Sequence, residues 1–248
     1  MCGKLKKVSR GVDPEDRRWF SEESISKLQK AQQEIEWLID RGYKVSPVLK
    51  MVGNHYQFSV RQRNALKRST ASSEEVKLRK SKCVCIDSLK DKCLYIDGFN
   101  LIITLETAFS GAPVILCNDG TYRDLAGLRG TYRIIDKTDY ALDAVGRKID
   151  DMQIRRVNFL LDRGVSNSGR LKKFILEYSV NWHACVEVNL MDDVDSFLYE
   201  KDRVVTSDSI ILDECFSWCN LARTTIDDCV PCARIVNLGG ENNQNSKS

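Results

Sequence analysis

From residue 83 onward, short apolar runs alternate with segments of helical length, and this alternation constrains the fold more than any other feature. Apolar strands separated by helices are typical of a parallel sheet that is covered on both faces. We therefore predict an α/β domain over residues 83–240, with right-handed connections between its strands. The expected strands are 93–97, 113–117, 157–162, 184–189, 203–207 and 233–238. The expected helices are 101–109, 140–152, 171–178, 195–199 and 210–221.

The first 82 residues are basic and predicted to be mainly helical. They hold 19 Lys and Arg against 10 Asp and Glu, whereas the remainder holds 19 against 25. An apolar stripe predicts an amphipathic helix at 25–39, which Ser21 caps and Gly42 ends. Further expected segments are a strand at 56–60, a basic helix at 61–69 and a polar linker at 70–82. Residues 1–82 are thus predicted to form a helical N-terminal domain with its linker.

Composition excludes several classes of protein. No apolar run approaches the ~18–20 residues of a membrane helix, and no apolar stretch follows the first lysines as in a secretory signal. We therefore expect a cytoplasmic protein without a membrane partner. Only two histidines and no Gly-rich phosphate loop are present, which argues against histidine-pair, nucleotide-driven and hydride chemistry. The polar tail at 241–248 is predicted to be disordered.

Aspartates end or follow four of the predicted strands: Asp97, Asp162, Asp208 and, after one further residue, Asp119. Because ligands of open α/β sheets bind outside the carboxyl ends of the strands, we expect these acids to converge. Such a cluster repels itself unless it is neutralised, and Mg²⁺ and Mn²⁺ prefer oxygen ligands of this kind. The pattern predicts a metal site able to hydrolyse a phosphodiester. For each aspartate taken singly, the alternative is a helix cap.

Three short motifs add to this expectation, namely YIDGFN at 95–100, FLLD at 159–162 and VVTSDS at 204–209. In this chain order they resemble the acidic strand ends of the PIN and NYN nuclease superfamily. The resemblance covers roughly residues 90–240. It implies a Rossmann-like, three-layer domain around a parallel sheet, and a metal-dependent nuclease that usually acts on RNA.

The same resemblance implies metal ligands at Asp97, Asp162 and Asp208, with Asn100 orienting the first turn. Glu106 lies nine residues after Asp97 on the next predicted helix, where we expect it to face solvent. Further acidic candidates are Asp124 and Asp213.

A second resemblance spans almost the whole chain and concerns a largely uncharacterised, mainly archaeal family. Members combine a helical N-terminal domain with a PIN-like C-terminal domain. The motifs that carry it are RGY at 41–43, VGNHY at 52–56, RQR at 61–63, DGFN at 97–100, SNSG at 166–169 and TSDS at 206–209.

Basic residues next to these motifs predict a nucleic-acid partner, RNA rather than DNA. Residues 61–82 carry eight cations against two carboxylates, a density that gives salt-sensitive affinity for polyanions. Ser166, Ser168 and Arg170 precede or begin a helix, where backbone amides favour phosphate. The alternatives are a solubilising linker and a plain helix cap. The candidate contacts in the basic regions are Arg61, Arg63, Lys67, Arg68 and Arg123.

The chain has ten cysteines, and most fall in predicted strands as small buried side chains. Four of them lie within one window near the C-terminus: Cys215, Cys219, Cys229 and Cys232. They could bind zinc or form disulfides, although two cysteines on one face of a helix are atypical of a structural zinc site. The sequence therefore leaves three hypotheses: a Mg²⁺- or Mn²⁺-dependent ribonuclease, a non-catalytic nucleic-acid-binding or scaffold protein, and a zinc or thiol protein.

Overall fold

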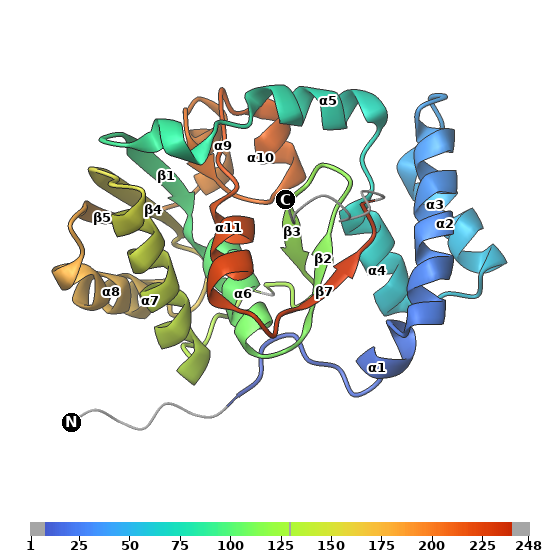
Figure 1. Cartoon of the computed structure of the whole chain (residues 1–248), viewed down its shortest axis with the longest axis horizontal. Helices are drawn as coiled ribbons and strands as arrows, with labels where there is room; N and C mark the ends of the chain where they lie inside the picture. The colour runs from blue at the N-terminus through green and yellow to red at the C-terminus, as the bar shows by residue number, and fades with distance from the viewer. Residues whose placement is uncertain (1–7, 129, 240–248) are drawn as a thin grey trace, which may run out of the picture.

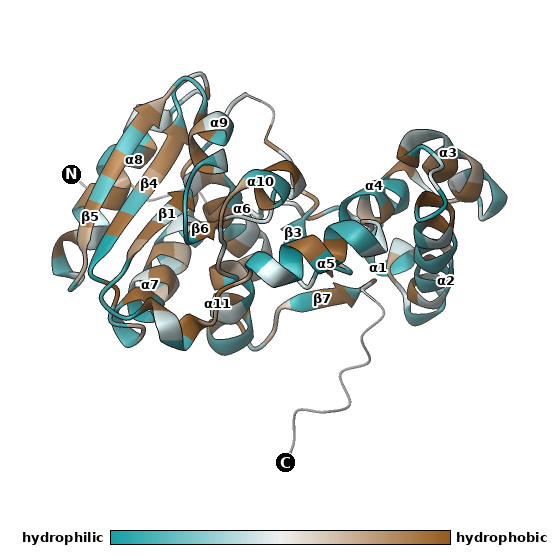
Figure 2. Cartoon of the chain, turned by 90° about the horizontal axis from the view of Figure 1, so that it is seen from above, coloured by the Kyte–Doolittle hydropathy of each residue, from teal (hydrophilic) through white to brown (hydrophobic). Residues whose placement is uncertain are grey.

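The computed structural model describes residues 8–128 and 130–239, so the expected disordered tail at 241–248 lies outside the described residues. Its larger sheet has four parallel strands in the order β5-β4-β1-β6, so the predicted parallel α/β class is confirmed at this level (Figure 1 and Figure 2). These strands are β1 (Cys93–Asp97), β4 (Arg156–Asp162), β5 (Cys185–Met191) and β6 (Val204–Val205). Because all four run in the same direction, their carboxyl ends lie along one edge of the sheet.

Helices cover both faces of this sheet, since alternate residues of β4 point to different cores. Phe159 and Leu161 pack against α6, α7 and α8, whereas Leu160 packs against α9 and α10. The helices on the first face are α6 (Gly98–Phe109), α7 (Asp136–Asp151) and α8 (Ser168–Tyr178). Those on the second are α9 (Val194–Tyr199) and α10 (Ser209–Glu214). Short 3₁₀ turns, η1 (Ile86–Leu89) and η2 (Ser179–Asn181), complete this part of the chain.

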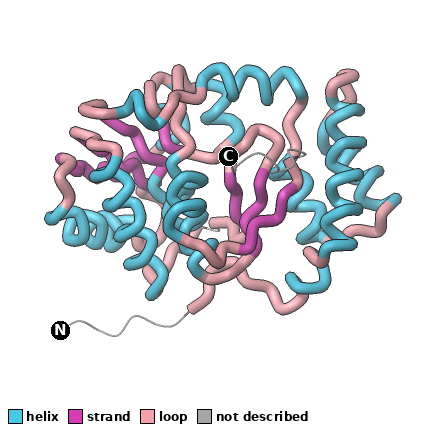
Figure 3. Tube along the Cα trace, in the orientation of Figure 1, coloured by secondary structure: helices cyan, strands magenta, loops and turns pink. Residues whose placement is uncertain are grey.

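Two runs that we expected in the main sheet instead form a second sheet, and this part of the prediction is wrong. Its order is β3-β2-β7, with β2 parallel to β7 and antiparallel to β3 (Figure 1), and its strands form a magenta group apart from the main sheet (Figure 3). The strands are β2 (Pro113–Leu116), β3 (Tyr122–Asp124) and β7 (Arg234–Asn237). Val114 and Leu116 point into the main core, while Ile115 packs against the N-terminal helices. An apolar run buried on both faces has the same sequence pattern in either sheet.

Of the five N-terminal helices that the structure describes, four share a hydrophobic cluster with this second sheet, which lies between them and the main sheet (Figure 2), whereas the last of the five packs against α10. The five helices are α1 (Asp16–Trp19), α2 (Glu22–Ile39), α3 (Val45–His55), α4 (Val60–Ser69) and α5 (Ser73–Lys82). Ser21 caps α2, as predicted, by accepting a hydrogen bond from the Ser24 amide. One hydrophobic cluster joins helices of this segment to β2 and β7, so the two predicted domains share a core. None of the helices in the described residues is long and apolar enough to cross a membrane.

Three local expectations in the chain are wrong. The predicted strand at 56–60 is the turn from α3 to α4, where Gln57 has φ 55°. The predicted linker at 70–82 contains α5, which begins with a capping box between Ser72 and Glu75. The predicted helix at 210–221 is interrupted after Glu214, and the next helix, α11 (Leu221–Cys229), begins afresh. The extended segment between them bridges Trp218 to Val204 and Cys83.

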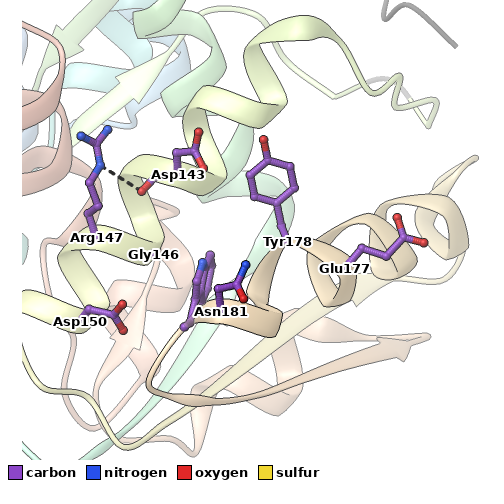
Figure 4. Close-up of a pocket in the computed structure, with 8 residues that line it drawn as sticks. Asp143, Gly146, Arg147, Asp150, Glu177, Tyr178 and Asn181 are labelled. Atoms are coloured by element: carbon purple, nitrogen blue, oxygen red, sulfur yellow. Dashed lines mark hydrogen bonds between the residues drawn. The ribbon is translucent and has the colours of Figure 1, made fainter. Parts of the chain in front are cut away.

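Trp182 packs directly against α7 at Gly146, where a Cβ atom would lie 2.3 Å from the indole Nε1. This contact borders a pocket of about 410 Å³ between α7 and the end of α8, in which Arg147 donates to the Asp143 carbonyl (Figure 4). We expect Gly146→Ala to lower the free energy of unfolding by about 1–3 kcal/mol, because the indole must move.

The matched control is Gly169→Ala, since Gly169 also lies in a helix but a Cβ there would meet no atom within 4 Å. That substitution should stabilise the protein by about 0.5–1 kcal/mol, because it restricts the unfolded chain. Urea denaturation of the parent and both variants measures the difference. Equal stability of the two variants would show that α7 accommodates the extra methyl group at Gly146.

Candidate active site

Four aspartates gather where the strands of the main sheet end. Asp97 ends β1, Asp162 ends β4, and Asp208 follows β6 after two residues. Asp195, which the sequence analysis did not select, lies in the first turn of α9 after β5. We refer to Asp97, Asp162, Asp195 and Asp208 as the acid group. Thus the structure brings together three of the four predicted aspartates and adds a new one.

The members of the acid group influence one another electrostatically. Burial raises the pKa of Asp97 to about 7, and the nearby carboxylates of Asp195 and Asp208 add to this rise. Its hydrogen bonds favour the charged form and oppose the rise. The pKa of Asp195 is raised by burial and then by Asp208, Asp162 and Asp193. Burial and Asp193 raise the pKa of Asp162. Shifts of this kind, caused by desolvation and like charges at a strand-end edge, are typical of functional sites.

Hydrogen bonds fix the position of Asp97 within the group. Its carboxylate accepts from the Thr206 hydroxyl at 2.9 Å and from the backbone N–H of Asn100 at 3.3 Å. The same Thr206 oxygen accepts from the Asp208 amide at 3.1 Å. Thr206 therefore connects Asp97 to the segment that carries Asp208.

Asn100 connects the first turn of α6 to the end of β6. Its side-chain carbonyl oxygen accepts from the Ser207 amide at 2.8 Å and from the Ser207 hydroxyl at 2.9 Å. Both contacts hold the residue immediately before Asp208. Asp208 itself caps α10, because its carboxylate accepts from the Ile210 amide at 2.9 Å. Capping and a role in the acid group are thus compatible for this residue, since a carboxylate has about four acceptor positions.

No Lys, Arg or His side chain among residues 8–128 and 130–239 forms an ion pair with a member of the acid group. The group therefore concentrates negative charge without a neutralising cation from the described chain. Its donors are carboxylate oxygens, which are the ligands that Mg²⁺ and Mn²⁺ prefer, so the donor chemistry fits these ions. In the described residues, however, no three His, Cys, Asp or Glu side chains are close enough together to hold a metal as they stand.

Asp119 lies outside the acid group, in a buried network of charges. Its carboxylate accepts from Arg79 at 2.8 Å, from Arg123 at 2.6 Å and from the Thr121 hydroxyl at 2.6 Å. Burial opposes its ionisation, yet the two guanidiniums and Thr121 lower the pKa of this carboxyl. Arg79 also binds Asp213, with nitrogen–oxygen distances of 2.6 and 2.8 Å. Asp119 and Asp213 therefore neutralise arginines.

Glu106 is fully buried, so the prediction that it faces solvent is wrong. It accepts hydrogen bonds from Tyr132 and Thr138 and forms an ion pair with Arg10 at 2.8 Å. Asp124 is also buried and accepts from the Thr104 hydroxyl at 3.3 Å. These contacts connect α6 to its neighbours and explain both carboxylates structurally.

The predicted nucleic-acid contacts fall into two classes. Arg61 forms an ion pair with Asp16 at 2.5 Å, and Arg63 donates to the carbonyls of Phe58 and Gly53. Arg123 is buried and donates to Asp119 and to two backbone carbonyls. These three arginines therefore have internal partners. Lys67 and Arg68 line a pocket, Ser166 and Arg170 are exposed, and Ser168 is buried at the start of α8.

All nine cysteines in the described residues are free thiols, including the four of the C-terminal window. Cys215 follows the last residue of α10 and Cys219 lies beyond it, so the prediction that they share a helix face is wrong. Burial raises the pKa of Cys215 to about 11 and that of Cys219 to about 12. Both thiols are therefore inert core side chains.

Comparisons with known proteins place the chain in a family. A family described as a domain of unknown function (DUF5616) matches residues 86–224, and one described as a protein of unknown function (DUF434) matches residues 27–82. An uncharacterised protein of Methanocaldococcus jannaschii is 37% identical over 185 residues, which cover 75% of this chain and 88% of the relative. No solved structure matches the chain significantly. The first match covers more than half of the chain, which therefore belongs to the DUF5616 family and has an archaeal relative, as the second resemblance predicted.

Proposed function

We propose that this protein is a metal-dependent phosphodiesterase that hydrolyses RNA at the acid group. The observation that carries the proposal is the convergence of four aspartates from four parallel strand ends, with no ion-pairing cation from the described chain. A cluster of like charges around the buried Asp97 is costly, and an exogenous cation is the simplest means of neutralising it.

The order of the main sheet supports a PIN-like domain. β1, in which the YIDGFN motif begins, lies between β4 and β6. The FLLD motif ends β4, and the VVTSDS motif begins with β6. Helices on both faces agree with the three-layer arrangement that the resemblance implies. The second sheet is the main addition to that arrangement.

The residues of the chain have separable roles in the proposed reaction. Bound Mg²⁺ or Mn²⁺ supplies charge neutralisation of the phosphodiester and lowers the pKa of a water molecule. Asp97, Asp162, Asp195 and Asp208 would hold the metal. Asn100 and Thr206 position two of these carboxylates through the hydrogen bonds described above. Carboxylates that hydrogen bonds hold in place in this way need little reorganisation during the reaction.

A cleavage assay with labelled single-stranded RNA tests the proposal. We expect cleavage with Mn²⁺ or Mg²⁺ and none with EDTA. Asp195→Asn should reduce the rate at least about 100-fold, because an amide replaces an anionic ligand. Asp192→Asn is the control, since Asp192 lies just before α9 in an exposed ion pair with Arg163 and should retain full activity.

If the parent binds RNA but cuts it under neither metal, the nuclease proposal fails. The alternative of a non-catalytic nucleic-acid-binding or scaffold protein would then take its place. If stoichiometric zinc is found in the purified protein, the cysteine hypothesis gains weight instead. Equal losses in Asp195→Asn and Asp192→Asn would mean that the segment after β5, rather than the acid group, matters.

A further inference from the structure

A pocket of about 550 Å³ joins the basic helical segment to the acid group. One wall comes from α4 and α5, and the other comes from the start of α6, the turn before α10 and the loop after β3. We refer to this pocket as the inter-domain groove. It is polar, and its charged lining residues are Lys67, Arg68, Arg79, Arg123, Glu75 and Asp208.

Four cations and two carboxylates line the groove, directly beside the negatively charged acid group, but only two of these cations lack a partner within the part of the protein that the structure describes. Arg79 and Arg123 are neutralised within the protein by Asp119 and Asp213. Lys67 and Arg68 are different, because neither side chain has an ion-pair or hydrogen-bond partner in the described part of the chain. Lys67 is exposed and Arg68 is half-buried, so both remain available for an anion that enters the groove.

The groove has a fixed geometry relative to the acid group. Arg123 donates to the Arg68 carbonyl at the end of α4 and, at 2.6 Å, to the Ser207 carbonyl beside Asp208. One buried guanidinium thus connects the two walls. Asp208, a member of the acid group, also lines the groove. So does Asn100, which holds the residue before Asp208 in place. A phosphate held by Lys67 and Arg68 would therefore lie in the same pocket as Asp208 of the acid group.

We propose that the inter-domain groove is a phosphate subsite for single-stranded polynucleotide, in which Lys67 and Arg68 hold a phosphate next to the one at the acid group. This inference rests on the proposed function and specifies its substrate. The volume of the groove lies within the range of small-ligand sites, so it suits one or two nucleotides of a single strand rather than a duplex. The helical segment is then one half of the substrate site rather than a separate module.

Binding is measured by fluorescence anisotropy with labelled single-stranded RNA and DNA of one sequence, in EDTA so that no cleavage occurs. We expect the Lys67→Ala/Arg68→Ala double variant to bind about 10- to 25-fold more weakly than the parent at 0.1 M salt. The slope of log affinity against log salt should fall by about 0.7, as expected when one phosphate of a single strand is no longer neutralised. A preference for RNA over DNA would indicate contact with the 2′-hydroxyl.

The control is Arg17→Ala/Lys50→Ala, which removes the same two residue types from exposed positions of α1 and α3. An equal loss of affinity and slope in both double variants would overturn the inference, since only net charge would then matter. The outcome is separable from that of the proposed function. If binding depends on Lys67 and Arg68 but no cleavage occurs, the nuclease proposal fails and the phosphate subsite stands. If the parent cleaves RNA with metal but the Lys67→Ala/Arg68→Ala variant binds RNA as tightly as the parent, the nuclease proposal stands and the subsite fails.

Discussion

At pH 8 and without divalent metal, Asp97→Asn should unfold at a higher temperature than the parent while cleaving RNA at least about 1000-fold more slowly when metal is added. The pKa of Asp97 is about 7 in the folded protein, against 3.8 for an ordinary aspartate. Its charged form therefore destabilises the folded state by roughly 4 kcal/mol above pH 7. Asparagine removes the charge and can keep both hydrogen bonds, because its amide can donate to Thr206 and its oxygen can accept from Asn100.

The direction of the pH dependence follows from the raised pKa. Below pH 4 the carboxyl is protonated in both folded and unfolded states, so its burial carries no charge penalty. As the pH rises toward 7, the unfolded chain releases this proton and the folded chain retains it, which lowers the stability of the parent. The advantage of Asp97→Asn should thus be small at pH 4 and reach about 8–16 °C in melting temperature at pH 8.

Thermal unfolding in EDTA from pH 4 to pH 8, with and without Mn²⁺, measures both effects. Mn²⁺ should stabilise the parent and leave the variant unchanged, because a ligand stabilises only the state that binds it. Asp151→Asn serves as the control, since this exposed aspartate lies at the end of α7 outside the acid group. A variant that melts below the parent at pH 8 would mean that the Asp97 carboxylate is needed for folding rather than for chemistry.

Replacement of Arg79 by methionine should lower the free energy of unfolding by about 3 kcal/mol, because the buried Asp119 keeps only one of its two guanidinium partners and the half-buried Asp213 loses the guanidinium that it binds. The Arg79 side chain is 3% exposed and contacts Asp119, which is fully buried, and Asp213. Its backbone carbonyl also accepts from the Trp218 indole at 2.7 Å. Arg79 thus secures α5 to the turn after β2 and to α10.

Denaturation of Arg79→Met beside Arg163→Met tests this expectation. Arg163 also forms an ion pair, with Asp192, but both side chains are more than half exposed. Exposed pairs of this kind contribute about 0–1 kcal/mol, so the second variant should resemble the parent. Comparable stabilities for the two variants would indicate that water or rearrangement compensates the charges of Asp119 and Asp213.

Local sequence signals determined the elements that depend on neighbouring residues. The Ser21 cap and the apolar stripe behind it fixed α2, and the apolar runs ending in Asp97 and Asp162 fixed β1 and β4. The capping box at Ser72 was an available signal for α5 that the dense charge of this segment obscured. The sequence indicated Asp195 only weakly. Three aspartates follow the expected strand at 184–189, and nothing in the sequence distinguishes Asp195 from the other two.

Sequence by itself determined the parallel α/β class, the helical N-terminal segment and the three aspartates that end strands, because periodicity and strand-end position are local properties. Only the tertiary structure decided that β2 and β7 form a separate sheet, since a strand buried on both faces carries no mark of its partner. The same holds for the charges. The sequence does not show which aspartate pairs with which arginine when the two are distant along the chain. Only their packing shows that Asp119 neutralises Arg79 and Arg123 and does not belong to the acid group.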